Sequence, residues 1–232
     1  MEIIYASFEL KIVFDNNNKG EKNFLPEFGF SVLIYNFYTE NYLLFDTGSN
    51  GEILIHNIEQ FNVNISEIKK IIISHNHHEH SMGLAEIYKI NPNIEISVPI
   101  ENLILFKRKY PKSKVIGVSD LTEIEHNIYS TGQLGTYLKE QALFLKSQDN
   151  KLIVIVGCCH PGLDEIISRA KAMKDSKGIK AIIGGFHGFR NFNCLEGIDF
   201  IGPCHCTKHL DLLENRFSER FNRIYVGSSF YF

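Results

Sequence analysis

Two short runs of the chain are apolar at every position, residues 71–73 (Ile-Ile-Ile) and 153–156 (Ile-Val-Ile-Val). A strand points its side chains alternately to the two faces of a sheet, so a wholly apolar strand has to be covered on both faces. Segments with apolar residues every three or four positions, such as residues 163–174, alternate with these runs and have the spacing of one helix face. The pattern therefore predicts an α/β fold in which helices cover the sheets.

The expected elements follow one another without a break in composition. Helices are predicted at residues 52–61, 81–90, 100–109, 163–174 and 208–217. Strands are predicted at residues 3–8, 30–36, 42–45, 70–74, 94–98, 115–118, 143–146, 152–156, 179–183 and 223–226. Because no linker rich in Pro, Gly or Ser divides the 232 residues, we expect a single domain over residues 1–232, with the polar patch 15–22 as an exposed loop.

Charge and cysteine content narrow the class of protein. The net charge is −3 and the isoelectric point about 6.4, so the chain has no general positive field that would hold nucleic acid or an anionic membrane surface. Five cysteines, an odd number in tight clusters, make a poor disulfide framework and fit a reducing compartment. No apolar run has the length of a membrane span, and residues 1–14 lack the features of a signal peptide. We therefore expect a soluble, cytoplasmic protein.

The segment Ser74-His75-Asn76-His77-His78-Glu79-His80 is the strongest chemical signal. It follows a predicted buried strand, and in an extended loop alternate side chains point the same way, so His75, His77 and Glu79 converge while His80 points elsewhere. One loop thus supplies ligands for two clusters, and imidazole with carboxylate suits zinc, iron or manganese. The competing interpretation is a solvated surface turn. The position of four histidines and a glutamate directly after a buried strand disfavours it. His78 is out of phase and is not expected to be a ligand.

Further ligand-type residues follow other predicted strands. The segments Asp46-Thr47-Gly48, Cys158-Cys159-His160, Gly184-Gly185-Phe186-His187 and Cys204-His205-Cys206 each come directly after an apolar run. Sites in α/β folds are built at the carboxyl ends of strands, so these segments are candidates for the same site.

The four cysteines in these segments have two interpretations. For Cys158 and Cys159, packed thiols are favoured over a redox or ligand role, because a free cysteine is usually a small buried hydrophobe. Cys204 and Cys206 flank His205 at alternate positions. They could supply a thiolate to a metal, although packing or tuning of the site is the favoured interpretation.

The run His75-x-His77-x-Glu79-His80, with Asp46-Thr47-Gly48 before it and His160 and His205 after it, resembles the metallo-β-lactamase superfamily. The resemblance implies a four-layer αββα sandwich, with two mixed sheets covered by helices, and a hydrolytic site that usually holds two metal ions. A narrower resemblance is to a subgroup labelled 7,8-dihydropterin-6-methyl-4-(β-D-ribofuranosyl)aminobenzene-5'-phosphate synthase, an enzyme of archaeal methanopterin biosynthesis. The segments that carry this second resemblance are 27–31, 140–143, 157–162, 184–187 and 202–207.

The resemblance also implies roles for individual residues. The ligands of the first metal would be His75, His77 and His160, and those of the second Glu79, His80 and His205. Asp46 would orient the site without binding metal. Candidate catalytic side chains are Asp46, Glu79 and His187. The implied cofactor is one or two Zn²⁺ ions, with Fe²⁺ or Mn²⁺ as alternatives.

Two positions depart from the pattern of the family. The family usually has aspartate where this chain has Glu79, so the carboxylate reaches one methylene further. The family also usually has a bridging aspartate where this chain has Gly184-Gly185, which implies weaker binding or loss of the second metal. His187 is close enough in sequence to serve as a ligand, an acid or a substrate contact.

Hydrolysis is the reaction expected by default, because a bound divalent cation lowers the pKa of water to about 7 and makes hydroxide available at neutral pH. The expected substrate is small and anionic and bears phosphate, and the turns 161–162 and 206–207 could offer it backbone N–H groups. The alternatives are a transferase that joins an activated dihydropterin to a ribofuranosyl-aminobenzene phosphate, a di-iron redox protein, and a metal-binding protein without turnover.

Overall fold

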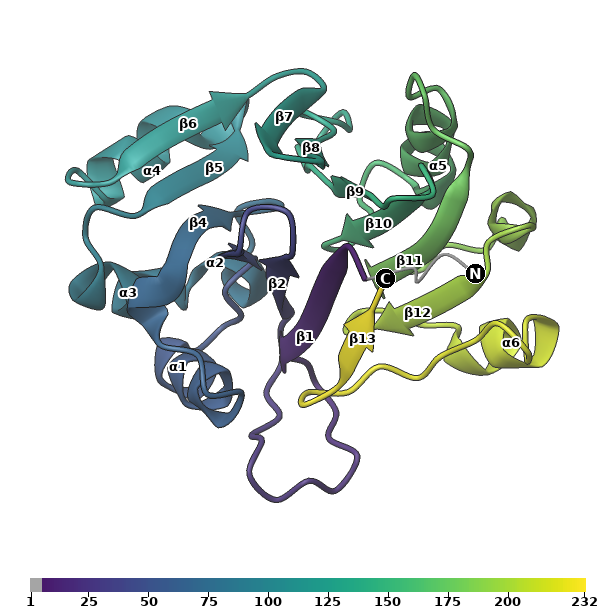
Figure 1. Ribbon diagram of the computed structural model, residues 1–232, viewed down its shortest axis with the longest axis horizontal. Coiled ribbons are helices and arrows are strands. Elements are labelled where there is room, and N and C mark those ends of the chain that lie inside the picture. Colours follow the sequence, from purple (N-terminus) through teal and green to yellow (C-terminus); the bar gives the residue numbers. More distant parts are fainter. Residues whose placement is uncertain (1–5) are drawn as a thin grey trace.

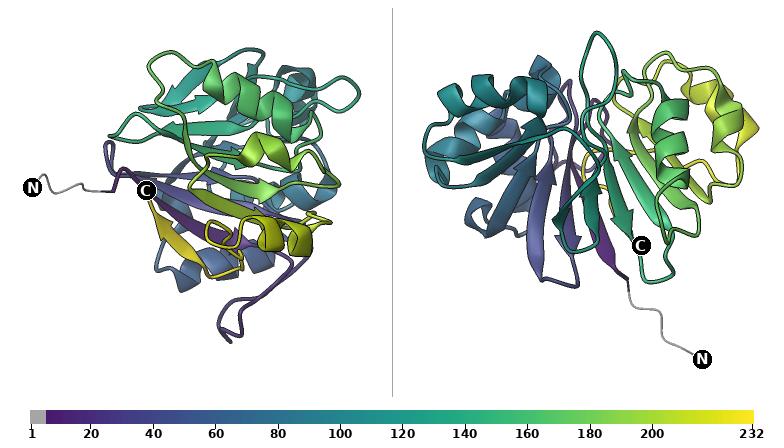
Figure 2. Two further views of the ribbon diagram at one scale, coloured as in Figure 1. Left: turned by 90° about the vertical axis from the view of Figure 1, so that its right-hand side faces the viewer. Right: turned by 90° about the horizontal axis from the view of Figure 1, so that it is seen from above.

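Two mixed sheets stacked face to face form the centre of the molecule in the computed structural model, which describes residues 6–232 (Figure 1). One sheet has seven strands in the order β13-β1-β2-β3-β4-β5-β6, and the other has six in the order β12-β11-β10-β9-β8-β7. The helices lie on the outer faces, so the αββα sandwich predicted from the sequence is confirmed (Figure 2, right).

The first sheet combines antiparallel and parallel pairing. Strands β1 to β3 pair antiparallel, as do β1 and β13, whereas β3 to β6 are parallel. Its strands are β1 (Phe8–Phe14), β2 (Ser31–Asn36), β3 (Asn41–Phe45), β4 (Ile68–Ile72), β5 (Glu95–Pro99), β6 (Lys114–Val118) and β13 (Ser229–Tyr231).

The second sheet has the same two kinds of pairing. Strands β7 to β10 pair antiparallel in sequence order, and β10, β11 and β12 are parallel. Its strands are β7 (Thr122–Glu125), β8 (Ile128–Ser130), β9 (Leu143–Lys146), β10 (Leu152–Val156), β11 (Ile179–Gly185) and β12 (Phe200–Cys204). The segments that carry the predicted metal ligands begin at the carboxyl ends of the parallel strands of both sheets.

Helices cover the outer face of each sheet (Figure 2, right). On the first sheet lie α1 (Gly51–Gln60), α2 (His78–Ser81), α3 (Leu84–Ile90) and α4 (Leu103–Lys109), and on the second lie α5 (Leu163–Lys171) and α6 (Leu210–Arg216). In the described part of the chain no helix combines the length and apolarity that crossing a membrane requires.

The wholly apolar strands face two different cores. Ile72 packs between the two sheets, whereas its neighbours Ile71 and Ile73 pack under the helices of the first sheet. In β10, Ile153 and Ile155 face the inter-sheet core and the remaining residues face α5. Each such side chain contributes about 1.5–3 kcal/mol on burial, which explains why these strands carry no polar residue.

Several expected elements differ from the structure. The predicted strand 3–8 falls mostly outside the described residues, and β1 occupies residues 8–14 instead. Residues 223–226 form no strand, and β7, β8, β12 and β13 were not predicted. Of the predicted helix 81–90 only residues 84–90 form a helix of their own, α3, because α2 already ends at Ser81. Between the two lies Gly83, where a Cβ atom would lie 2.0 Å from the carbonyl oxygen of Thr47. The predicted helix 208–217 begins only at Leu210, because the chain first turns at residues 205–209.

Candidate metal centre

Five imidazole rings meet where strands of the two sheets end. One group consists of His75 and His77, from the loop after β4, and His160, from the loop after β10. Their ring centroids are 4.7 Å (His75–His77), 4.8 Å (His75–His160) and 5.0 Å (His77–His160) apart. His80 lies 4.3 Å from His75 on one side and 5.0 Å from His205 on the other. The structure thus gathers the five histidines that the sequence singles out as ligands.

Glu79 belongs to the second half of this assembly. One ligand atom each from Glu79, His80, Cys158 and His205 lies within 4.8 Å of the others, and a second such group consists of His75, Cys158 and His160. His77 stands at the open side, its Nδ1 3.1 Å from Nε2 of His75 and 3.9 Å from a carboxylate oxygen of Glu79. His78, in contrast, is exposed on α2.

The tautomers of three imidazoles follow from their hydrogen bonds. Ser74 donates its hydroxyl proton to Asp46, so the 2.9 Å contact between Ser74 Oγ and Nδ1 of His75 requires that the ring donates. His80 donates from Nδ1 to Asp46 (2.7 Å), and His205 donates from Nδ1 to Asn16 Oδ1 (3.0 Å). In the neutral form of each ring Nε2 therefore keeps its lone pair, which is the form that binds a metal.

Two of the Nε2 atoms show directly that the residues fit a cation. Nε2 of His160 and Nε2 of His205 are buried and have no hydrogen-bond partner in the described structure. A buried polar atom without a partner costs about 1–3 kcal/mol, and divalent transition metals are the natural partners of converging imidazoles. Burial lowers the pKa of His75, lowers that of His160 to about 4 and lowers that of His205 to about 3, so these rings are neutral and available as ligands at pH 7.

Asp46 is hydrogen-bonded to both ends of the loop after β4. Its carboxylate is completely buried and accepts hydrogen bonds from the N–H of Ser74 (2.6 Å), the hydroxyl of Ser74 (2.7 Å) and Nδ1 of His80. Burial raises the pKa of Asp46. Burial alone would lower the pKa of His80, but the carboxylate raises it.

Glu140 has a matching role for the loop after β10, which the sequence analysis did not recognise. Its buried carboxylate accepts the N–H groups of Gly157 (3.1 Å), Cys158 (2.9 Å), Cys159 (3.1 Å) and His160 (2.8 Å). Burial raises the pKa of Glu140, and the N–H groups oppose that shift. The carboxylate fixes the backbone that carries His160.

The loop after β12 is held by residues expected to form an exposed loop. Asp15 is buried and accepts the N–H of His205 (3.0 Å), while Asn16 donates to the carbonyl of His205 (3.0 Å) and accepts from its ring. Only the later part of the polar patch 15–22 is exposed. Burial raises the pKa of Asp15 to about 6.

The backbone turns sharply at four of these strand ends. Asp46 (φ 59°), Cys159 (φ 59°), His187 (φ 44°) and His205 (φ 49°) all adopt left-handed conformations. Such a conformation costs of order 1–3 kcal/mol and persists where surrounding contacts enforce it, typically at functional sites. Hydrogen bonds of the buried carboxylates supply that enforcement at Asp46, Cys159 and His205, and at His187 the carbonyl accepts the N–H of Lys208.

The cysteines divide into two kinds. Cys159 packs in the core under α5 and Cys204 in the core between the sheets, as expected for small buried hydrophobes. Cys158 lies inside the centre, with Sγ 3.1 Å from Nε2 of His80. Hydrogen bonding to the neighbouring thiol of Cys206, together with burial, raises the pKa of Cys158.

His187 lies at the mouth of the centre. Its side chain is exposed and its ring centroid is 5.4 Å from that of His160. Together they line an open depression of about 310 Å³ that also involves Phe186 and Phe189. On the other side the half-exposed ring of Phe28 lies 5.0 Å from His205. A small molecule reaching the imidazoles would contact these groups.

In each of the two turns considered for anion binding, a backbone N–H group already donates a hydrogen bond within the protein. The N–H of Gly162 donates to Cys159 (2.9 Å), and that of Thr207 donates to Cys204 (3.1 Å). Asp164, in the first turn of α5, adds negative charge there.

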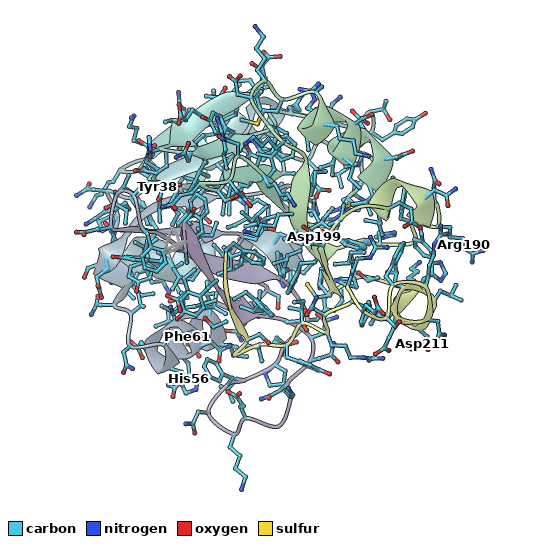
Figure 3. All side chains as sticks on the ribbon, turned by 45° about the vertical axis from the view of Figure 1, so that its right-hand side comes forward. Tyr38, His56, Phe61, Arg190, Asp199 and Asp211 are labelled. Carbon is cyan, nitrogen blue, oxygen red and sulfur yellow. The ribbon has the colours of Figure 1, made fainter. Side chains whose placement is uncertain are left out.

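The remaining histidines lie apart from the centre: His56, for example, contacts the carbonyl of Asn23 (2.9 Å) in the loop after β1, and Figure 3 shows it at the edge of the molecule.

Known proteins share both the sequence pattern and the fold. The chain is 25% identical to 7,8-dihydropterin-6-methyl-4-(β-D-ribofuranosyl)-aminobenzene-5'-phosphate synthase of Methanocaldococcus jannaschii, over 80% of this chain and 82% of the relative. An uncharacterized protein of the same organism is 28% identical over 85% and 90% of the two chains. The crystal structure of Tm1679, described as a metal-dependent hydrolase of the β-lactamase superfamily, superposes with a TM-score of 0.77 at 24% identity and covers 96% of this chain and 98% of that one. The sequence profile of the metallo-β-lactamase superfamily matches residues 25–141, and the chain belongs to that superfamily.

Proposed function

We propose that this chain is a metal-dependent hydrolase that acts on a small anionic substrate. One observation carries the proposal: several Nε2 lone pairs converge, two of them buried without a partner, while hydrogen bonds fix the opposite side of the rings. Such an arrangement is unfavourable without a cation and is the ordinary geometry of a histidine-rich metal site.

The ligand assignment of the sequence analysis is retained in this proposal. His75, His77 and His160 hold one cation, and Glu79, His80 and His205 hold the second, with Zn²⁺ as the preferred ion and Fe²⁺ or Mn²⁺ as alternatives. When bound, divalent cations lower the pKa of water and polarise the bond that is to be cleaved.

Other residues of the centre orient the ligands or stand where a substrate would contact them. Asp46 fixes the ring of His80, and Glu140 fixes the backbone of His160. Glu79 and His187 are the candidates for proton transfer, since both stand beside the imidazoles at the accessible side. The bound cations would give the depression a positive potential, which favours an anionic, phosphate-bearing substrate.

The test combines metal content with activity. Purified protein loaded with Zn²⁺, Fe²⁺ or Mn²⁺ is analysed for bound metal and screened with phosphodiesters, thioesters and lactones. Replacing His75 and His160 together by alanine should abolish binding of the first cation and hydrolysis, whereas His78→Ala, in the same segment but exposed, should retain both cations and the activity. Full metal content in the double variant would contradict the ligand set.

A transferase is the second candidate, and the relative from Methanocaldococcus jannaschii favours it, because the similarity covers four fifths of both chains. In that reaction an aminobenzene nitrogen, rather than water, would displace the diphosphate of an activated dihydropterin, and the metal-binding residues would hold the cations that stabilise this leaving group. Incubation of metal-loaded protein with the activated dihydropterin and the ribofuranosyl-aminobenzene phosphate tests it. Absence of a coupled product at every metal loading would remove this candidate and leave the hydrolase.

A further inference from the structure

One atom of the metal centre belongs to both of its halves. Sγ of Cys158 lies within 4.8 Å of the ligand atoms of His75 and His160 in one group, and equally within 4.8 Å of those of Glu79, His80 and His205 in the other. Among the described residues it is the one ligand atom that the two groups share. The side chain is 2% exposed, so the thiol is enclosed between the two sets of imidazoles.

The end of β11, which reaches the same region, contributes no side chain. Its last residues are Gly184 and Gly185. A Cβ at Gly184 would lie 1.9 Å from the carbonyl oxygen of Val156, and one at Gly185 would lie 2.5 Å from a carbonyl oxygen and 2.6 Å from Sγ of Cys206. The packing therefore excludes a carboxylate at this strand end.

The buried carboxylates nearby are also committed. Asp46 accepts three hydrogen bonds from the loop after β4, Glu140 accepts four N–H groups, and Asp15 accepts the N–H groups of Asn17 and His205. The sulfur of Cys158 contacts Nε2 of His80 at 3.1 Å and the thiol of Cys206, and it accepts no backbone N–H group as the carboxylates do. Nε2 of His205, itself buried without a partner, points into the same group.

We propose that the thiolate of Cys158 bridges the two cations of the centre. The inference rests on the proposed function, because it needs the two-cation site. On binding, the S–H bond breaks, the proton passes to water, and two lone pairs of the sulfur form bonds to the two cations. A soft thiolate at the shared position favours Zn²⁺, Fe²⁺ or Co²⁺ over Mg²⁺ and Ca²⁺.

Cobalt(II) titration tests the bridge without measuring activity. The metal-free protein is titrated with Co²⁺, bound metal is counted by elemental analysis, and the thiolate-to-cobalt charge-transfer absorption is followed in the near ultraviolet. We expect two ions per chain and a band that grows with both equivalents, since one sulfur contacts both ions. Cys158→Ser should lose the band, whereas Cys206→Ser, which removes the neighbouring thiol, should keep it.

The outcomes separate this inference from the proposed function. Two bound ions without a charge-transfer band, or a band that persists in Cys158→Ser, would overturn the bridge and leave the metal-dependent hydrolase standing. A band that saturates after the first of two equivalents would overturn bridging in favour of terminal ligation. Binding of no cobalt at all would overturn the metal centre itself. The wild-type titration decides between these results even where a variant folds poorly.

Discussion

Replacement of Glu140 by glutamine should destabilise the protein although the two side chains have nearly the same shape. The carboxylate accepts four backbone N–H groups, three on Oε1 at 2.9–3.1 Å and one, from His160, on Oε2 at 2.8 Å. Glutamine keeps one oxygen and replaces the other with an NH₂ group. Two donors then face each other at one of the four contacts, and the other three lose their charged acceptor.

The magnitude follows from the number of contacts. Loss of one hydrogen bond to a charged group removes about 1.5–3 kcal/mol, and exchange of a charged for a neutral acceptor weakens each of the other three by about 1 kcal/mol. Relief of a buried negative charge offsets several kcal/mol of this sum. We expect the free energy of unfolding of Glu140→Gln to fall by about 3 kcal/mol, which lowers the Tm of a chain of this length by roughly 6–12 °C.

Guanidinium unfolding of the metal-free protein, followed by circular dichroism, measures this difference. Glu165→Gln is the matched control, because Glu165 is exposed on α5 and makes no comparable contact in the described structure. The control should remain within about 0.5 kcal/mol of the wild type, as is usual for surface substitutions. A Glu140→Gln variant as stable as the control would refute the idea that this carboxylate holds the loop after β10.

Three further predictions concern the same centre. Asp46→Asn should keep the fold, because asparagine tolerates the left-handed φ of 59°, but should weaken metal binding about 10–100-fold in a chelator competition, since the imidazole it orients loses its acceptor. Burial lowers the pKa of His160 to about 4 and of His205 to about 3. Below pH 6.5 the unfolded chain therefore takes up protons that these rings refuse in the folded chain, which lowers the metal-free Tm as the pH falls from 7 to 4. Because the raised pKa of Asp15 acts in the opposite direction, the wild type is compared with His160→Asn, whose Tm should fall less over this range. An equal pH dependence of the two proteins contradicts the burial of this ring. Gly184→Ala should lower the free energy of unfolding by roughly 3 kcal/mol or more, because positive-φ strain adds to a Cβ 1.9 Å from a carbonyl oxygen of β10. Gly178→Ala is the control that measures the backbone strain alone, because Gly178 has a φ of 107° and open space around the new Cβ. An equal decrease in the free energy of unfolding of the two variants would exclude a contribution from the close contact at Gly184.

The interior of the fold was predictable because its strands carry a strong pattern. Residues 71–73 and 153–156 are apolar on both faces, and the structure buries alternate side chains in two different cores. Two of the missed strands lack that pattern: β7 (Thr122–Glu125) has charged residues at alternate positions, and β13 (Ser229–Tyr231) is a three-residue edge strand. Such strands form because a neighbour offers unpaired backbone groups, which leaves little trace in the residues themselves.

The histidines of the centre were predictable for a different reason. Several histidines directly after buried strands are seldom needed for packing alone. Their residue type and their position after a strand are therefore enough to predict a metal site. Asp15 and Glu140 give no such signal, because each acts on backbone N–H groups of a segment far along the chain: Asp15 is 190 residues from His205, and Glu140 is 20 residues from His160. A sequence pattern cannot specify that kind of partner, since every residue except proline carries the same N–H group.

Each of the three ligand-bearing loops is thus held by one buried carboxylate. Asp46 holds the loop after β4, Glu140 the loop after β10 and Asp15 the loop after β12. Burial raises the pKa of all three, so each loop is held by a group whose ionisation is less favourable in the protein alone than in water. Cations among the imidazoles would lower these pKa values by direct attraction and strengthen the hydrogen bonds that position the ligands. Metal binding and loop order are then coupled, and each carboxylate should increase metal affinity without being a ligand.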